Sequence, residues 1–310
     1  MSSAPDSLKH TTLQVGPDFV IIGAMKCATS SVHDQLAMLE GVSMSDPKEP
    51  NFFSDEENWA MGLGWYESLF ASMPVRDLKG ESSTHYSKRP TYPKCARRLY
   101  DFVPNAKLVY IMRDPIERIV SQYIHEWSMQ MFEKDCSIDD AIERYPILVD
   151  YSKYAMQIEP YIELFGTESV LPVFFERMKI DPDSELQRIA SHVGYQGKVV
   201  WHEQDAQNVS SARQRRSPVL NKVLDVRLIQ MARRSLLPES LRAKVRSRWT
   251  MNERPVLSDR SIACLHEQLD PDLNRLGDLL GIKLNCLEFT QVVTRDAAPV
   301  WACVPGDSHE

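Results

Sequence analysis

The amino-acid sequence predicts an α/β fold, a single domain with a central, mostly parallel sheet flanked by helices. Short apolar segments rich in β-branched residues alternate with amphipathic segments of helical period, a pattern typical of a parallel sheet with crossover helices. Polar turns that could bind an anion follow two of these apolar segments directly. The chain of 310 residues has the length of one large α/β domain.

The first strand and helix are predicted near the N-terminus. Residues 18–22 (DFVII) are β-branched and apolar and predict a buried strand, which runs into the turn GAMKCATSS at 23–31. Apolar residues then recur at helical spacing and predict a helix from about residue 30 to residue 39. Residues 46–65 have no clean period and are expected to form a long loop, and loops of that kind are often functional.

A second strand, turn and helix are predicted further along the chain. This unit starts at Lys107, with LVYIM at 108–112 as the strand, RDP as the turn and residues 116–129 as the helix, and Pro115 stands in the first helical turn, where proline is tolerated. The later predicted elements are a helix at 151–165, a strand at 170–175, and helices at 183–193, 217–235 and 258–281. Pro172 fits the interior of its predicted strand poorly.

The domain limits and the overall composition bound the functional class. We expect a flexible tail at 1–16, the domain at 17–291 and an irregular tail at 292–310. The net charge of −7 and the pI of about 5.7 argue against a general nucleic-acid binder. Six cysteines without CxxC spacing predict free thiols and no zinc site. The polar N-terminal segment and the short apolar runs predict a cytoplasmic protein without a membrane span.

Two segments carry the features of anion sites. In GAMKCATSS, Lys26 and three hydroxyl side chains stand between a strand and a helix N-terminus, where backbone N–H groups favour an anion. The spacing is not that of a Walker A loop, because Lys26 lies three residues after Gly23 and precedes a cysteine. In RDPIERIVS, Arg113 ends a strand beside a helix, and Arg suits bidentate phosphate contact. When each segment is taken singly, an alternative remains open. The first could be a helix cap with an incidental Lys, and the second a structural Arg–Asp pair.

Together, these segments resemble the PAPS-dependent sulfotransferase family, whose donor is 3′-phosphoadenosine 5′-phosphosulfate. GAMKCATSS resembles the family's 5′-phosphosulfate loop, and RDPIERIVSQY resembles its 3′-phosphate motif. KEPNFF at 48–53 and GESS at 80–83 also match, and the ordered resemblance covers roughly residues 17–285. It is most similar to the branch of heparan-sulfate and related bacterial enzymes. The resemblance implies a P-loop-like domain that binds PAPS and releases PAP without a metal.

The resemblance also implies roles for individual residues. The implied PAPS-binding residues are Lys26, Cys27, Ala28, Thr29, Ser30 and Ser31 in the first loop, Arg113 and Ser121 in the second motif, and Ser211, Arg213 and Arg215 in a late loop. Lys26 and Glu49 are the implied catalytic residues, Lys26 for charge on the leaving side and Glu49 as general base. His85 and His125 are the alternative bases, and a surface position in an acidic loop is the alternative interpretation of Glu49.

The acceptor side is less defined. Lys48, Phe53, Trp65 and Tyr86 are expected to bind an acceptor, either a glycan or a small molecule. Ala28 replaces a usual glycine, which suggests that the loop needs no positive φ there, and Ser82 replaces a lysine of some glycan-modifying members. Two other functions remain open, a kinase-like P-loop enzyme and a non-catalytic nucleotide-binding protein. The sequence identifies neither the acceptor nor the oligomeric state.

Overall fold

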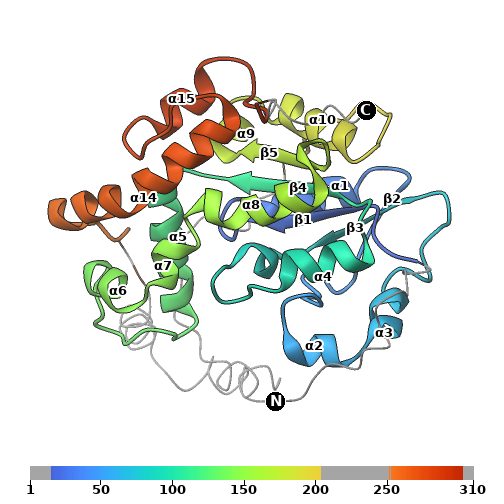
Figure 1. Cartoon of the computed structure of the whole chain (residues 1–310), viewed down its shortest axis with the longest axis horizontal. Coiled ribbons are helices and arrows are strands. Elements are labelled where there is room, and N and C mark those ends of the chain that lie inside the picture. The colour runs from blue at the N-terminus through green and yellow to red at the C-terminus, as the bar shows by residue number, and fades with distance from the viewer. Residues whose placement is uncertain (1–14, 204–250, 252, 303–310) are drawn as a thin grey trace, which may run out of the picture. The chain divides into compact units, whose positions relative to one another are not determined.

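The computed structural model describes residues 15–203, 251 and 253–302 (Figure 1). The predicted late loop with Ser211, Arg213 and Arg215 and the predicted helix at 217–235 lie outside the described residues. The chain divides into two compact units, and each is described by itself. The first comprises Met1–Pro115, Asp150–His202 and His266–Glu310, and the second comprises Ile116–Val149 and Glu203–Leu265.

The first unit is built on a five-stranded sheet in the order β2-β3-β1-β4-β5, in which every pair of neighbouring strands is parallel. The strands are β1 (Phe19–Gly23), β2 (Val42–Met44), β3 (Leu78–Ser82), β4 (Lys107–Met112) and β5 (Val170–Phe174). The side chains of β1 are all buried, as expected for a strand covered on both faces. The predicted α/β fold with a parallel sheet is therefore confirmed.

Helices cover both faces of this sheet. The main helices of the first unit are α1 (Thr29–Ala37), α4 (Cys95–Phe102), α8 (Tyr154–Phe165), α9 (Phe175–Ile180) and α10 (Pro182–His192). Helix α4 packs against α8 and α1 packs against α10, and Figure 1 shows α4 and α8 in front of the strands. Connections between parallel strands are almost always right-handed, so a chain that moves from β1 toward β2 and later toward β5 places helices on opposite faces.

Strand β5 lies at the edge of the sheet, which explains how it contains Pro172. A proline lacks the N–H that a central strand must donate on one side, so an edge position accommodates it. The outer side of this strand is covered by side chains. The Arg188 guanidinium donates to the Pro172 carbonyl at 2.9 Å, and the Trp301 indole N–H donates to the Val170 carbonyl at 2.6 Å.

The structure corrects several sequence-based expectations in this unit. Residues 46–65 are not one long loop, because α2 (Glu56–Ala60) and the start of α3 (Leu63–Ser68) lie in them. Strands β2 and β3 were not predicted. The expected boundary between domain and irregular tail at 291/292 falls inside α15 (Phe289–Arg295), whose Phe289 is fully buried. The described residues of this unit also form two short 3₁₀ helices, η2 (Thr84–Ser87) and η3 (Thr167–Ser169).

The described residues of the second unit form helices. These are α5 (Pro115–Ser128), α6 (Ile138–Arg144) and α7 (Ile147–Asp150), together with the N-terminal part of α14 (Asp259–Leu280). Helix α6 begins with a capping box, in which the Ser137 hydroxyl accepts from the Asp140 backbone N–H at 3.1 Å. No helix in the described part of the chain is both long enough and apolar enough to cross a membrane.

Candidate active site

The loop between β1 and α1 presents backbone N–H groups at the carboxyl end of the central strand. Helix α1 begins without any side-chain cap on its first turn and without acidic residues there. The first N–H groups of a helix have no partner inside the helix, and the helix dipole makes this end favourable for an anion. Hydroxyl side chains from Thr29, Ser30 and Ser31 lie in the same turn, and Lys26 is half-buried in the loop. The loop is therefore suited to bind a phosphate or sulfate group.

The conformation of Ala28 contradicts the sequence-based expectation. Ala28 has φ 63° and ψ 21°, the left-handed region, so the expectation that this position needs no positive φ was wrong. Lys26 also has a positive φ of 71°. A left-handed residue with a Cβ costs about 1–2 kcal/mol. Strained backbone of this kind is common where a loop must present its amides to a ligand.

A half-buried lysine connects this loop to the next segment. The Lys48 ammonium donates to the Ser30 hydroxyl, and burial lowers the pKa of Lys48. The neighbouring His33 is buried on α1, where its Nδ1 lies 2.9 Å from the Ser82 hydroxyl at the end of β3. Burial, and then the charge of Lys48, lower the pKa of His33 to about 4. His33 is therefore neutral near pH 7.

The lowered pKa of His33 predicts a pH dependence of stability. The unfolded state takes up a proton at this residue near pH 6.5, whereas the folded state does so only near pH 4. The free energy of unfolding should therefore fall as the pH drops through this window, by about 1–3 kcal/mol after solvent screening. Urea unfolding of wild type and His33→Gln at pH 7 and pH 4.5 measures this contribution. An equal loss in both proteins would contradict it.

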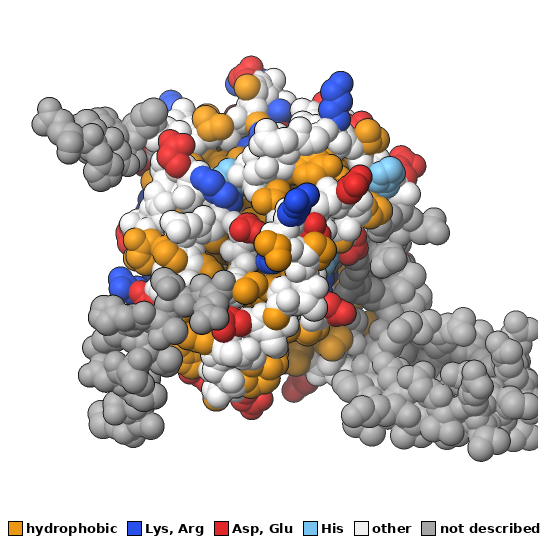
Figure 2. All heavy atoms as spheres, turned by 90° about the vertical axis from the view of Figure 1, so that its right-hand side faces the viewer, with side chains coloured by type: hydrophobic (Ala, Val, Ile, Leu, Met, Phe, Trp, Pro, Cys, Tyr) orange, Lys and Arg blue, Asp and Glu red, His pale blue; other side chains and the backbone are white. Residues whose placement is uncertain are grey.

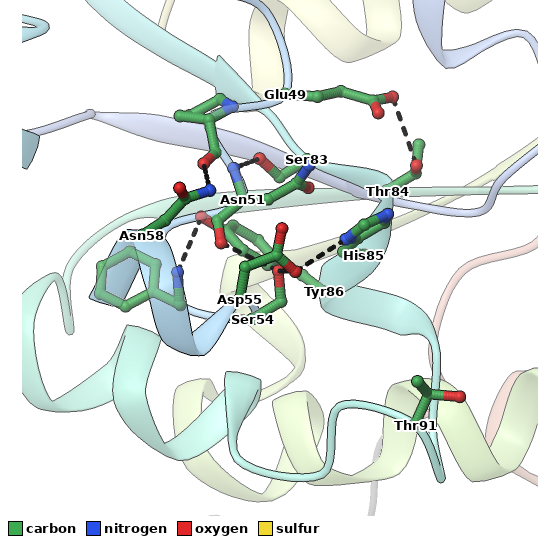
Figure 3. A network of polar contacts seen from close by, with 12 residues as sticks. Glu49, Asn51, Ser54, Asp55, Asn58, Ser83, Thr84, His85, Tyr86 and Thr91 are labelled. Carbon is green, nitrogen blue, oxygen red and sulfur yellow. Dashed lines mark hydrogen bonds and ion pairs between the residues drawn. The ribbon is translucent and has the colours of Figure 1, made fainter. Parts of the chain in front are cut away.

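Residues 48–54, called here the Glu49 segment, contact the end of β3 and the start of η2 (Figure 3). The Glu49 backbone N–H donates to the Ser82 carbonyl at 3.0 Å, and its Oε1 accepts from the Thr84 hydroxyl at 3.3 Å. Two non-glycine residues of this segment have left-handed backbones, Glu49 with φ 57° and Asn51 with φ 50°. The Asn51 N–H donates to the Ser83 hydroxyl at 3.1 Å. The position of Glu49 is thus fixed by a hydrogen bond from its own backbone N–H and by one from the backbone N–H of Asn51.

His85 and Asp55 form a pair beside Glu49. The His85 Nδ1 lies 3.1 Å from Asp55 Oδ1, and the imidazole stacks on Tyr92 with ring centroids 4.9 Å apart. Burial, followed by the charge of Lys88, lowers the pKa of His85, while Asp55 opposes this shift. Figure 3 shows the Glu49–Thr84 contact and the His85–Asp55 pair within one network of polar contacts. The other alternative base, His125, lies on α5 in the second unit.

Two of the expected acceptor-binding residues belong to the core. Phe53 has no exposed surface and Tyr86 is 1% exposed, so neither side chain reaches an acceptor in this structure, and the sequence-based assignment needs correction. Phe53 packs edge-on against Tyr86 and against Tyr66, with centroids 5.7 and 5.0 Å apart. Trp65 is half-exposed and lies 5.9 Å from the ring of Phe52. Only Lys48 and Trp65 of the predicted set have surface to offer an acceptor.

A cavity of about 790 Å³ adjoins Lys48 at the β2 edge of the sheet. Its lining comes from α1, β2 and the segment after it, and the end of α3. The polar contributors include Lys48, Asp46 and the buried hydroxyl of Ser45, and the apolar ones include Leu69 and Met73. A cavity of this volume is within the range that takes up small organic ligands.

Arg113 and Ser121, expected to bind the 3′-phosphate, belong to different units. Arg113 directly follows β4 in the first unit, next to the strand that carries the first loop, and its guanidinium lies 4.9 Å from the ring centre of Phe175. Its carbonyl accepts from the Tyr154 hydroxyl at 2.7 Å, which fixes the turn. Ser121 is buried on α5 in the second unit. The placement of both on one phosphate stays a prediction from the motif.

Comparisons with known proteins assign the family. The model of the sulfotransferase domain matches residues 16–225, more than half of the chain. The chain therefore belongs to the sulfotransferase family. A solved sulfotransferase from Alicyclobacillus acidocaldarius superposes with a TM-score of 0.58 at 22% identity, covering 86% of this chain and 97% of that one. At this identity, the likeness shows the shared fold alone.

Two curated proteins are similar over parts of the chain. Heparan sulfate glucosamine 3-O-sulfotransferase 3B1 of Mus musculus is 29% identical over 188 residues, which cover 57% of this chain and 46% of that protein. Membrane-associated sulfotransferase kil1 of Dictyostelium discoideum is 32% identical over 124 residues, which cover 39% of this chain and 25% of that protein. The chain therefore spans about half or less of the length of these relatives.

Proposed function

We propose that this chain is a PAPS-dependent sulfotransferase, which transfers a sulfuryl group to a hydroxyl or amine of a carbohydrate or small-molecule acceptor. The observation that carries the proposal is the junction at the carboxyl ends of β1, β2 and β3. There the anion-binding loop and the Glu49 segment are joined through the contact of Lys48 with Ser30. Membership of the sulfotransferase family supports it.

The first loop fits the 5′-phosphosulfate of the donor. Its uncapped helix start offers N–H donors, Thr29 and Ser30 offer hydroxyl donors, and Lys26 offers a positive charge. Arg113 and Ser121 are assigned to the 3′-phosphate by their motif, and the late loop with Ser211, Arg213 and Arg215 is assigned to cover the nucleotide by resemblance. PAPS is the donor substrate and supplies the sulfuryl group. PAP is the product.

On the acceptor side, Glu49 is the general base. The acceptor loses its proton to the Glu49 carboxylate as its oxygen or nitrogen forms a bond to sulfur. The bond between sulfur and the 5′-phosphate oxygen breaks, and PAP keeps that electron pair. Lys26 stabilises the charge that develops on this leaving oxygen. Transfers of this kind depend on in-line positioning and charge stabilisation more than on covalent catalysis by the protein.

The acceptor class rests on different observations. The mouse relative is named for a heparan sulfate acceptor, which favours a glycan. The cavity next to Lys48 is lined by one lysine, one aspartate, one histidine, four serines and six apolar residues, and this balance of charges favours an acceptor of low charge. The cytoplasmic location remains a prediction from the sequence, and one relative is named as membrane-associated. A kinase-like enzyme is disfavoured by the absence of Walker A spacing around Lys26.

A transfer screen tests the function. The protein is incubated with PAPS and a panel comprising N-sulfated heparosan, octyl β-D-glucoside, 4-nitrophenol and tyramine, and each product is examined by mass spectrometry for the gain of a sulfo group. Release of PAP is measured in parallel. PAP should also raise the Tm, since it binds only the folded protein. Stabilisation by ATP with magnesium but not by PAP would favour the kinase-like alternative.

The 3′-phosphate assignment makes a separate prediction. Arg113→Ala should weaken PAP by about 10- to 100-fold, because a charge-assisted hydrogen bond to phosphate is lost, and Ser121→Ala should weaken it several-fold. The affinity for AMP, which lacks the 3′-phosphate, should fall much less in both variants. Calorimetric titration of both nucleotides measures the difference, with Arg97→Ala as the matched surface control. Equal losses for PAP and AMP would rule out this assignment.

A further inference from the structure

A buried carboxylate lies beneath the Glu49 segment. Glu81, on β3, has no exposed surface, and burial raises its pKa. Three hydroxyl groups donate to it. The Ser83 hydroxyl lies 2.6 Å and the Tyr86 hydroxyl 2.7 Å from Oε1, and the Tyr66 hydroxyl donates to Oε2. An unpaired buried carboxylate would be costly, so this set of donors is what allows Glu81 to occupy the core.

Two of these hydroxyls connect Glu81 to the backbone of the Glu49 segment. The Ser83 oxygen accepts from the Asn51 N–H at 3.1 Å, and the Tyr86 oxygen accepts from the Phe53 N–H at 3.4 Å. Each hydroxyl donates its only proton to Glu81 and therefore presents a lone pair to a backbone amide. The third hydroxyl, on Tyr66, donates to Glu81 and makes no hydrogen bond to this segment in the described part of the chain.

The Glu49 segment needs such an anchor because its backbone is strained. Glu49 and Asn51 both have positive φ angles, 57° and 50°, in a stretch without glycine. Conformations of this kind persist only where the surroundings over-determine them. The bond from Asn51 to Ser83 lies two residues from Glu49, while the Glu49 carboxylate itself has a longer contact of 3.3 Å to Thr84. Two backbone bonds, from the Glu49 N–H to the Ser82 carbonyl at 3.0 Å and from the Asn51 N–H to the Ser83 hydroxyl, therefore constrain this carboxylate more than its own side-chain contact does, and the second of them depends on a side chain that can be replaced.

We propose that Ser83, oriented by the buried Glu81, is a positioning residue for Glu49. Ser83 fixes the strained backbone that places the Glu49 carboxylate, and Glu81 fixes the direction in which the Ser83 oxygen accepts. Tyr86 supports the same segment through the weaker contact at Phe53. The catalytic consequence rests on the proposed function of Glu49, whereas the anchoring of the backbone does not.

The test compares two variants that each remove one hydroxyl from Glu81. Ser83→Ala removes the link to the Asn51 amide, and Tyr66→Phe removes a hydroxyl without such a link. Hydrogen exchange of the 48–54 segment, read by mass spectrometry, should become at least about 10-fold faster in Ser83→Ala and stay near wild type in Tyr66→Phe. Equal acceleration in both variants, or none in Ser83→Ala, would overturn the anchoring role.

Turnover gives the second readout. With the best acceptor of the transfer panel, Ser83→Ala should lower kcat by about 10- to 100-fold, since small misplacements of a catalytic group have effects of that size. PAP affinity should stay near wild type, and Tyr66→Phe should keep kcat within about threefold despite a similar fall in Tm. In a Glu49→Gln background, Ser83→Ala should lower kcat no further.

The outcomes separate the inference from the proposed function. A Glu49→Gln variant that keeps full activity refutes the base, while the exchange data still decide the anchor. A multiplicative loss in the Ser83→Ala, Glu49→Gln double variant shows that Ser83 acts independently of Glu49 and refutes the positioning role. If Ser83→Ala does not fold, Tyr86→Phe is measured in its place. Hydrogen exchange of the 48–54 segment should then be faster than in wild type, and kcat should fall less than is expected for Ser83→Ala. Unchanged exchange in Tyr86→Phe refutes the anchoring of this segment through Glu81.

Discussion

Replacing Glu49 by glutamine is expected to lower sulfuryl transfer by about 10²–10⁴-fold while leaving PAP affinity near wild type. Glutamine keeps the shape of the side chain, and its amide oxygen still accepts from the Thr84 hydroxyl. It cannot accept the acceptor's proton. The backbone contact of Glu49 with the Ser82 carbonyl is unaffected, so the segment should keep its position. Steady-state kinetics with PAP titration as the folding control measures both quantities.

The competing bases are tested on the same acceptor. His85 is the stronger rival, because Asp55 orients its imidazole and it lies in the same network as Glu49 (Figure 3). Its lowered pKa keeps it neutral near pH 7 and able to accept a proton. His85→Ala should nevertheless reduce transfer less than Glu49→Gln does. If Glu49→Gln retains nearly wild-type transfer while His85→Ala or His125→Ala is inactive, the assignment of the base to Glu49 is wrong.

Removing the Lys26 ammonium is expected to lower turnover by about 10²–10³-fold, the usual cost of one electrostatic contact to developing charge. The lysine lies in the loop that precedes α1, where the leaving oxygen of the donor is assigned. Its effect should therefore be larger on kcat than on PAP affinity. Both are measured for Lys26→Ala and for Lys26→Asn, because asparagine tolerates the left-handed backbone of this position more readily than alanine does.

Full turnover with only weakened PAP binding in both Lys26 variants would show that the lysine is an anchor for the donor and not a catalytic residue. A loss confined to Lys26→Ala would instead point to the backbone of the loop. The comparison matters because three residues of this loop, Gly23, Lys26 and Ala28, have positive φ angles, so a substitution there changes backbone preference as well as charge.

The sequence predicted the strands whose whole length is apolar. Strands β1 and β4 are buried segments with β-branched side chains, and their pattern is clear without any knowledge of the fold. Strand β3 has the sequence LKGES, and its charged residues do not give the apolar pattern of a buried strand. The sequence alone does not show that the glutamate is buried, because its hydrogen-bond partners are known only from the fold. Strand β2 has only three residues, too few to establish a period.

The candidate site was predicted as a set of motifs but not as a geometry. The first loop and Arg113 lie at the ends of neighbouring strands, as a parallel sheet requires. Phe53 and Tyr86 were expected to bind the acceptor, yet both are buried and pack against each other. The hydroxyl donors of Glu81 come from positions 66, 83 and 86, and only the folded chain brings the first of these to the others.

The covering of β5 has a consequence for solution behaviour. An uncovered edge strand is a template onto which another chain can add, and natural proteins block such edges to avoid aggregation. On the face that Figure 2 shows, charged side chains are interspersed with hydrophobic ones. Here the carbonyls of Val170 and Pro172 are engaged by Trp301 and Arg188, and Pro172 offers no N–H at all. Strand pairing with another chain is therefore blocked at Val170 and Pro172, so Trp301 and Arg188 protect this edge against aggregation as well as completing the fold.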